Sequence, residues 1–160
     1  MLLRPLGEAD LPVVEALIAE PAVVRWWGAH DEQRLRRDLL EDELTESFAI
    51  ELEGQLIGVL LVSEENTPDY RHAALDISLA TAHHGRGLGR EALRTMIDHL
   101  VDERGHHRFT IDPNVGNAVA IRCYSAVGFK PVGVMRRYER GSDGNWGDGL
   151  LMDLLANERL

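Results

Sequence analysis

The sequence of 160 residues contains a single cysteine, Cys123, so no disulfide can form within the chain. Such scarcity is typical of proteins in a reducing cytoplasm, where we expect this one. No apolar run approaches the roughly 20 residues that cross a bilayer, and the first residues lack the features of a signal peptide. No internal repeat, low-complexity tract or linker interrupts the chain, which predicts one domain over residues 1–160.

Positive charge is also scarce. The chain has 17 Lys and Arg against 27 Asp and Glu, a formal net charge of −10. Such a surface repels nucleic acid and anionic membranes and attracts cations, so we expect neither nucleic acid nor membrane as a partner. The charge serves solubility in any case. It points to a cationic substrate only if carboxylates also line a binding site.

The apolar pattern and the turn signals predict an α/β fold. We expect strands at residues 2–6, 48–52, 56–62, 74–80, 108–112, 129–138 and 149–155, and helices at 8–20, 31–43, 88–104 and 116–127. The unit from Ala74 to Asp112 implies two parallel strands joined by a right-handed crossover. The other strands read as antiparallel. The prediction is a mixed, mostly antiparallel sheet flanked by helices, and not a Rossmann fold.

The loop from Ala82 to Gly89 carries three glycines at alternate positions, between a predicted strand and a predicted helix. Glycine tolerates positive φ, so backbone N–H groups can turn toward one point. The start of a helix adds unpaired N–H groups and the positive end of its dipole. These features predict a phosphate-binding loop. The Lys-Ser/Thr pair of a nucleotide P-loop is missing, which leaves other phosphorylated ligands.

A second block, from Asn117 to Phe129, reads Asn-x-x-Ala-x-x-x-Tyr-x-x-x-Gly-Phe. Together with the loop His84-Gly85-Arg86-Gly87-Leu88-Gly89, it resembles the GCN5-related N-acetyltransferases (GNAT), which use acetyl coenzyme A. The resemblance covers residues 2–155, although His84 stands where the family has Arg or Gln. It implies a single-domain fold in which the parallel strands 74–80 and 108–112 splay apart.

The resemblance assigns coenzyme binding to the loop and to one face of the following block. The residues concerned are Leu79, His84, Gly85, Arg86, Gly87, Leu88, Gly89, Arg90, Asn117, Ala120 and Tyr124. It implies that loop amides hold the diphosphate, that Asn117 and Ala120 accommodate the pantetheine arm, and that Tyr124 protonates the departing thiolate. The Leu79 amide would bind the thioester carbonyl oxygen. The alternatives are a capping Asn117 and a core Tyr124.

The acceptor amine must lose a proton before it attacks, because primary amines are mostly protonated at pH 7. Asp112 and Asp76 are the candidate bases, and each lies opposite apolar neighbours on its strand. The resemblance favours Asp112 as the base. The alternatives are a turn cap before Pro113 for Asp112 and a solvated strand face for Asp76.

Within the superfamily the chain is similar to aminoglycoside 6′-N-acetyltransferases. The matching segments are Val24–Gly28, Ile111–Pro113, Ala120–Tyr124 and Asp148-Gly149. The similarity implies direct transfer of an acetyl group in a ternary complex to a small polycationic amine, with an antibiotic-resistance role as one possibility. Trp26, Trp27, Asp76, Asp112 and Asp148, with Glu139 as a further candidate, would form the acceptor site. One tryptophan of the pair is expected in the core.

Other functions stay open at this stage. A siderophore, lysine or protein N-terminal acyltransferase shares part of the motifs, and a non-catalytic coenzyme A sensor is the alternative outside catalysis. Cys123 has no evident basic partner and reads as a structural thiol. The pairs His83-His84 and His106-His107 lack metal-site spacing, so no metal is expected. The sequence leaves monomer and homodimer equally open.

Overall fold

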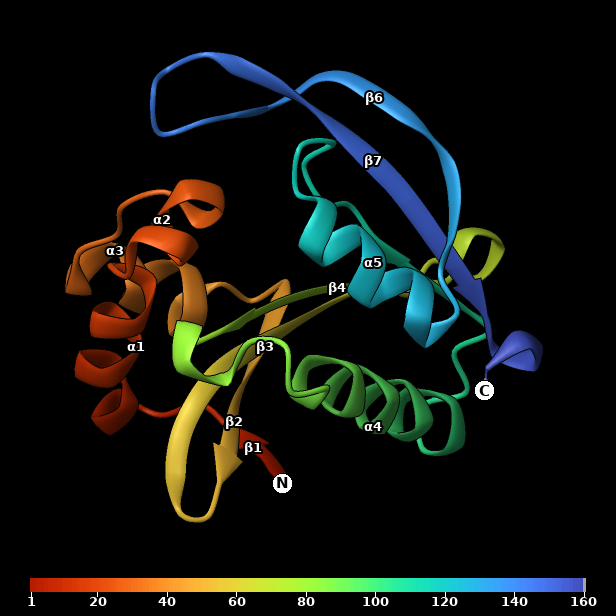
Figure 1. Ribbon diagram of the computed structural model, residues 1–160. Helices are drawn as coiled ribbons and strands as arrows, with labels where there is room; N and C mark the ends of the chain where they lie inside the picture. The colour runs from red at the N-terminus through yellow and green to blue at the C-terminus, as the bar shows by residue number, and fades with distance from the viewer. Residues whose placement is uncertain (160) are drawn as a thin grey trace.

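The computed structural model describes residues 1–159, and Leu160, the last residue of the predicted domain, lies outside the described residues. The described chain forms a seven-stranded sheet in the order β1-β2-β3-β4-β5-β7-β6 (Figure 1). The strands are β1 (Leu2–Pro5), β2 (Thr45–Leu52), β3 (Gln55–Glu65), β4 (His72–Leu79), β5 (Arg108–Ile111), β6 (Lys130–Arg140) and β7 (Trp146–Leu155). β4 and β5 run parallel and the other neighbours antiparallel, so the predicted mixed sheet is confirmed.

The helices flank this sheet on both faces. They are α1 (Leu11–Ile18), α2 (Pro21–Trp27), α3 (Glu32–Arg36), α4 (Leu88–Asp102) and α5 (Ala118–Val127). A π-helical turn, η2 (Arg37–Glu41), extends α3, and short 3-10 turns occur at η1 (Glu8–Asp10), η3 (Pro68–Tyr70), η4 (Thr81–His83) and η5 (Ala156–Glu158). α2 lies outside the helices predicted from the sequence. Its first residue is Pro21, which has no N–H to continue α1 but suits the first turn of a new helix.

Two hydrophobic clusters hold the helices to the sheet. α4 and α5 pack on one face, where Ile50 and Leu60 of the sheet meet Leu93 and Met96 of α4. α1, α2 and α3 pack on the other face, against a cluster that includes Ala49 and Val59 of the sheet. Neighbouring residues of β2 and β3 thus serve opposite cores, as the alternation of a strand requires. Figure 1 shows the two groups of helices as separate layers, with the β6–β7 hairpin rising above α5.

The sheet opens in its middle. β4 pairs with β3 along its whole length, from His72 to Leu79, but with β5 only at Ala73 and Ala74. Beyond Ala74 the two parallel strands part, and the chain leaves β5 after Ile111. The splay implied by the family resemblance is therefore present.

Candidate active site

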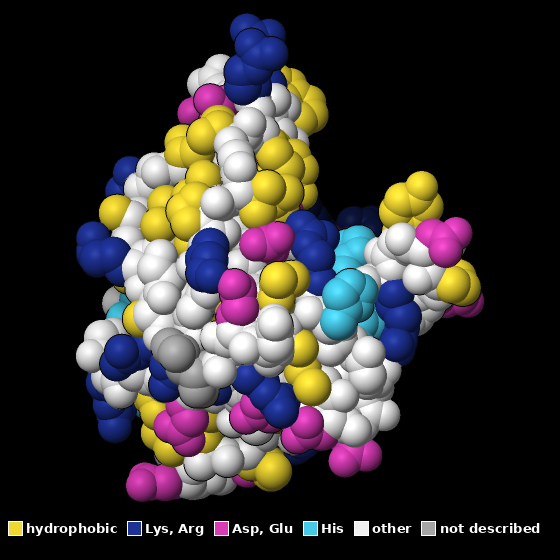
Figure 2. Space-filling model, turned by 90° about the vertical axis from the view of Figure 1, so that its right-hand side faces the viewer, with side chains coloured by type: hydrophobic (Ala, Val, Ile, Leu, Met, Phe, Trp, Pro, Cys, Tyr) yellow, Lys and Arg dark blue, Asp and Glu magenta, His cyan; other side chains and the backbone are white. Residues whose placement is uncertain are grey.

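A cavity of about 1230 Å³ lies where β4 and β5 part. α2, α3 and η2 form one wall, β4 and the end of β5 form the floor, and the glycine loop, the start of α4, α5 and β6 form the rest. Figure 2 shows a notch in the surface, with histidine and basic side chains gathered beside it. Sites for one small ligand usually measure about 300–1,000 Å³. The larger volume here leaves room for two ligands.

The glycine loop has the geometry of an anion cradle. Gly85 and Gly87 have φ values of 72° and 81°, in the left-handed region that favours glycine. Gly87 is the N-cap of α4, and its carbonyl accepts the N–H of Glu91 at 3.1 Å. The N–H groups of the residues before Glu91, in the first turn of α4, have no acceptor within the helix. These amides and the helix dipole fit the coenzyme diphosphate that the family resemblance implies.

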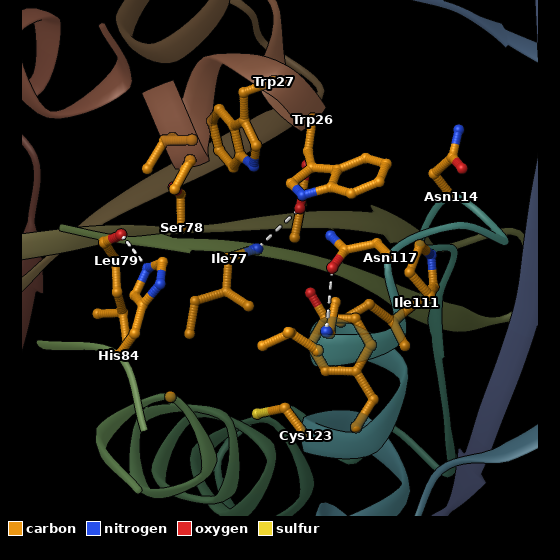
Figure 3. A pocket seen from close by; sticks show the side chains of 18 of the residues that line it. Trp26, Trp27, Ile77, Ser78, Leu79, His84, Ile111, Asn114, Asn117 and Cys123 are labelled. Carbon is orange, nitrogen blue, oxygen red and sulfur yellow. Dashed lines mark hydrogen bonds between the residues drawn. The ribbon is translucent and has the colours of Figure 1, made fainter. Parts of the chain in front are cut away.

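The side chains of the loop are arranged differently from the expectation. His84 contacts the Leu79 carbonyl through Nε2 at 2.8 Å and so ties the loop to the end of β4 (Figure 3). Arg86 donates to Nδ1 of His83 at 3.2 Å and lies outside the cavity lining. The arginines that line this part of the cavity are Arg90 of α4 and Arg122 of α5.

The edge of β4 that faces the gap presents backbone amides. The Ala80 N–H donates to the Ile57 carbonyl on the β3 side at 2.9 Å. Because amides alternate in direction along a strand, the N–H groups of Leu79 and Ile77 point the other way. Ile77 bears this out, since its N–H donates to Oδ1 of Asp76 at 2.8 Å. The Leu79 amide is thus directed toward the region that β5 has left.

Three carboxylates, on or directly after three strands, line the cavity close to one another. Asp76 of β4, Asp112 after β5 and Glu139 of β6 all contribute. Asp76 is exposed on the cavity wall, but the protein packed around its carboxylate removes part of the hydration of the charged form. This desolvation, with smaller contributions from the charges of Asp112 and Glu139, raises the pKa of Asp76 to about 7. Desolvation and the charge of Asp112 also raise the pKa of Glu139.

Asp112 is held by a residue that the sequence analysis did not single out. The phenol of Tyr138 in β6 donates to Oδ2 of Asp112 at 2.5 Å. This hydrogen bond favours the neutral, protonated phenol and, with desolvation, raises the pKa of Tyr138 to about 12. Tyr138 carries no motif signal, because its approach depends on pairing between β6 and β7.

The helix α5 presents the second motif to the cavity. Asn117 is the N-cap, accepts the Ala120 N–H at 3.1 Å through Oδ1 and also lines the cavity, so the capping alternative applies beside any ligand role. Tyr124 is 6 % exposed and packs edge-on against Phe129, while part of it reaches the cavity. Desolvation holds the pKa of Tyr124 well above its usual value. Desolvation also raises the pKa of Cys123, which does not suit a nucleophile.

Both tryptophans of α2 line the cavity, and Figure 3 shows them above Ile77 and Asn117. Trp27 also packs against the core under α1–α3, so the expectation of one core tryptophan holds only in part. The guanidinium of Arg25 lies over the Trp26 ring at 4.8 Å. Sequence reasoning missed the α3–η2 wall, where His30, Arg34 and Asp38 face the cavity, because a cavity wall leaves no motif.

The structure does not bring Asp148 to the cavity lining. Its carboxylate accepts the N–H of Arg137 at 2.8 Å, within the β6–β7 hairpin. Within residues 1–159, no group of three or more His, Cys, Asp or Glu side chains has metal-binding geometry. In the same range no helix combines the length and apolar character needed to span a bilayer.

Comparison with known proteins identifies the family. Residues 1–130 match the family model described as "Acetyltransferase (GNAT) domain". The aminoglycoside N(6')-acetyltransferase type 1 of Klebsiella pneumoniae is 30% identical over 154 residues, covering 83% of this chain and 75% of that protein.

Solved structures show the same fold. The spermidine N-acetyltransferase of Vibrio cholerae, in complex with CoA and spermine, aligns with a TM-score of 0.83 and 22% identity, over 98% of this chain and 96% of that one. The aminoglycoside acetyltransferase AAC(6')-Ib with coenzyme A aligns with a TM-score of 0.80 and 23% identity, over 98% and 95%. With its glycine loop, its splayed strands and these matches, the chain belongs to the GNAT acetyltransferase family, enzymes that use acetyl-CoA.

Proposed function

We propose that the protein acetylates a primary amine of a small polycationic acceptor by direct transfer in a ternary complex. The 6′-amine of an aminoglycoside is the best candidate. The observation that carries the proposal is the separation of charge in the cavity. Arg90 and Arg122 line the cavity from α4 and α5, whereas Asp76, Asp112 and Glu139 gather where β4 and β5 part. The two arginines on the α2–α3 wall already have partners, since Arg25 lies over Trp26 and Arg34 pairs with Asp38 at 3.3 Å. An anionic coenzyme and a cationic amine therefore each find a complementary end.

The coenzyme end uses backbone more than side chains. The amides of the first turn of α4 would hold the diphosphate, with Arg90 adding charge. His84 ties the loop to the Leu79 carbonyl, and Arg86 forms a hydrogen bond with His83 on the surface of the loop. Asn117 would offer its amide nitrogen to the pantetheine arm, since its Oδ1 is engaged by the helix cap. The small Ala120 leaves space beside it.

The acceptor end supplies charge and an aromatic wall. Asp112, fixed by Tyr138, would bind an ammonium group of the acceptor. The tryptophans of α2 would cover the acceptor ring or its cationic groups. The names of two relatives, an aminoglycoside and a spermidine acetyltransferase, both denote acceptors with several amines. The same fold also occurs in a ribosomal-protein-alanine N-acetyltransferase of Brucella melitensis, so the carboxylates of the cavity, and not the names of relatives, support a polycation over a peptide.

The transfer step needs a proton acceptor, a group that binds developing negative charge, and a proton donor. Acetyl-CoA supplies the acetyl group activated as a thioester. A carboxylate with a pKa of about 7 suits a base at neutral pH, so Asp76 would take the amine proton. This assignment reverses the preference for Asp112 that the sequence suggested. The Leu79 amide would donate to the carbonyl oxygen, and the Tyr124 phenol would protonate the departing thiolate.

Thiol release from acetyl-CoA tests the proposal with a panel of aminoglycosides, polyamines, lysine derivatives, siderophore amines and peptide N-termini. We expect turnover of aminoglycosides or polyamines, and product mapping by mass spectrometry and NMR would show whether the 6′-amine is modified. Turnover confined to peptides, free lysine derivatives or siderophores would reject the acceptor class. Turnover confined to polyamines would retain the class and reject the aminoglycoside.

A further inference from the structure

The β6–β7 hairpin contains an irregularity that faces the cavity. Met135 pairs with Gly149 and Glu139 pairs with Gly147, so residues 136–138 of β6 lie opposite the single residue Asp148 of β7. Arg137, in the middle of this bulge, has a φ of 50°, which non-glycine residues rarely adopt. The Asp148 carboxylate accepts the Arg137 N–H at 2.8 Å and so holds the bulge. This gives Asp148 a role in shaping the hairpin.

The bulge changes which side chains reach the cavity. Consecutive residues of a regular strand point to opposite faces. Tyr138 and Glu139 nevertheless both line the cavity, because the extra residues before them break the alternation. Gly149 makes room for the phenol ring, since a Cβ there would lie 2.8 Å from Cδ1 of Tyr138. Asp148 and Gly149 therefore serve one result, the placement of Tyr138.

Within residues 1–159 the phenol of Tyr138 fills one of the two acceptor positions of Oδ2 in Asp112, whereas Oδ1 has no hydrogen-bond donor, so Oδ1 is the more available oxygen. The phenol takes Oδ2 of Asp112 at 2.5 Å. An alkylammonium can bind a carboxylate through one oxygen, whereas a guanidinium binds best through two parallel hydrogen bonds to both oxygens. Deepening the proposed function, and resting on it, we propose that Tyr138 determines specificity. Its hydrogen bond to Asp112 makes this carboxylate bind alkylammonium groups in preference to guanidinium groups. Asp148 is a positioning residue that acts through Tyr138.

Binding to the protein saturated with coenzyme A tests this inference without turnover. The probes are putrescine and the bis-guanidine of the same chain length, measured by calorimetry. The unchanged protein should prefer putrescine. Tyr138→Phe keeps the ring but frees Oδ2 of Asp112, and should shift the affinity ratio toward the bis-guanidine by about tenfold, the effect of one charge-assisted hydrogen bond. The amine panel tests the proposed function separately.

The supporting residues provide a second, independent measurement. Asp148→Ala and Gly149→Ala should each shift the ratio in the same direction, and neither should add to the shift of Tyr138→Phe when combined with it. Gly133→Ala is the matched control, because it also lies in β6 and a Cβ there has nothing within 4 Å. It should keep the ratio of the unchanged protein. The inference is overturned by an unchanged ratio in Tyr138→Phe, by additive effects, or by an unchanged protein that binds neither probe or prefers the bis-guanidine.

Discussion

The carboxylate of Glu20 accepts a hydrogen bond of 2.6 Å from the backbone N–H of Thr81. Glu20 is the N-cap residue of α2, the helix that carries Trp26 and Trp27, and Thr81 begins the turn that leads to the glycine loop. One side chain therefore joins the acceptor wall to the coenzyme loop.

Removal of this link should affect both substrates together. In Glu20→Ala the Thr81 amide loses its partner, so we expect the KM values for acetyl-CoA and for the amine each to rise by about threefold to tenfold, the effect of one lost hydrogen bond. Steady-state kinetics with both substrates varied would measure this. Glu20→Gln retains an acceptor oxygen and is the matched control. A change confined to one substrate, or an equal change in Glu20→Gln, would contradict the link.

The pH dependence of the rate should reflect Asp76. Its pKa is raised to about 7 and its carboxylate must be ionised to take a proton, so kcat/KM for the amine should fall as pH drops below about 7. Asp112→Asn removes a negative neighbour and should lower the pKa of Asp76, moving this acid limb to lower pH while raising the KM for the amine. A limb that stays in place or moves to higher pH would exclude Asp76 as the titrating base.

Asp76→Asn should lower the rate and raise stability. Loss of a general base reduces kcat by about 10²–10⁴-fold. A carboxylate with a raised folded-state pKa destabilises the fold as pH rises from its ordinary value of 3.8 through about 7. Because Asp76 also meets cavity water, we expect a gain of only about 1 kcal/mol above pH 7, or roughly 2–4 °C in Tm.

The gain in stability of Asp76→Asn should vanish at low pH, because Asp76 of the unchanged protein is then protonated in the folded and in the unfolded state. Thermal melts across the pH range would measure it. Asp69→Asn, an exposed aspartate in η3, is the control and should change neither rate nor Tm. A destabilised Asp76→Asn at pH above 7 would show that the folded state favours the charged carboxylate.

Tyr124→Phe removes the phenol hydroxyl and keeps the aromatic ring, so it tests the hydroxyl as proton donor. The ring that packs against Phe129 is retained, so the fold should be kept. Loss of the proton donor should reduce kcat by about 10²-fold with little change in the KM for acetyl-CoA. Single-turnover measurements would show whether chemistry is the slowed step. Tyr70→Phe, at a residue that is 74 % exposed, controls for loss of a phenol elsewhere. An unchanged kcat would leave Tyr124 as a packing residue.

Substitution of Gly87 tests the coenzyme loop, and Gly54, in the turn between β2 and β3, is the matched control. Their φ values are 81° and 80°, so alanine strains the backbone equally, by about 1–2 kcal/mol. Only Gly87 lies in the cavity wall, where a Cβ would approach the Arg90 guanidinium at 3.3 Å. Gly87→Ala should raise the KM for acetyl-CoA strongly, whereas Gly54→Ala should lower Tm alone. Equal kinetic effects would remove the loop from coenzyme binding.

Much of the fold was predictable because its determinants are local. The alternation of Phe48 to Leu52 and the apolar stripe of the helix after Gly87 specify elements that the structure confirms. The helix α2 was not predicted, since seven residues span only about two turns, too few to establish a periodic pattern, and Val23 is the one buried residue among them. Strand ends also differed, as in β3, which runs on to Glu65. The ladder with β4 stabilises that extension, and no local sequence feature encodes it.

Within the candidate site, the residues in local motifs were predictable from the sequence, and those placed by strand pairing were not. Gly87, Asn117 and Tyr124 stand in motifs of fixed spacing, and the structure places all three in the cavity wall. Tyr138 could not be found from the sequence, because its approach to Asp112 depends on a register shift between two strands. The same shift explains why Asp148, which the resemblance assigns to the acceptor site, instead binds the Arg137 N–H within the hairpin.

The opening between β4 and β5 also divides the molecule mechanically. One block of sheet comprises β1 to β4 and the other β5, β7 and β6, and the only strand pairing across the seam within residues 1–159 is at Ala73 and Ala74. The core beneath α4 and α5 provides the rest of the joint. A ligand bound in the seam contacts both blocks of the sheet and adds contacts between them. Catalytic turnover and the rigidity of the whole chain are thereby linked at one place.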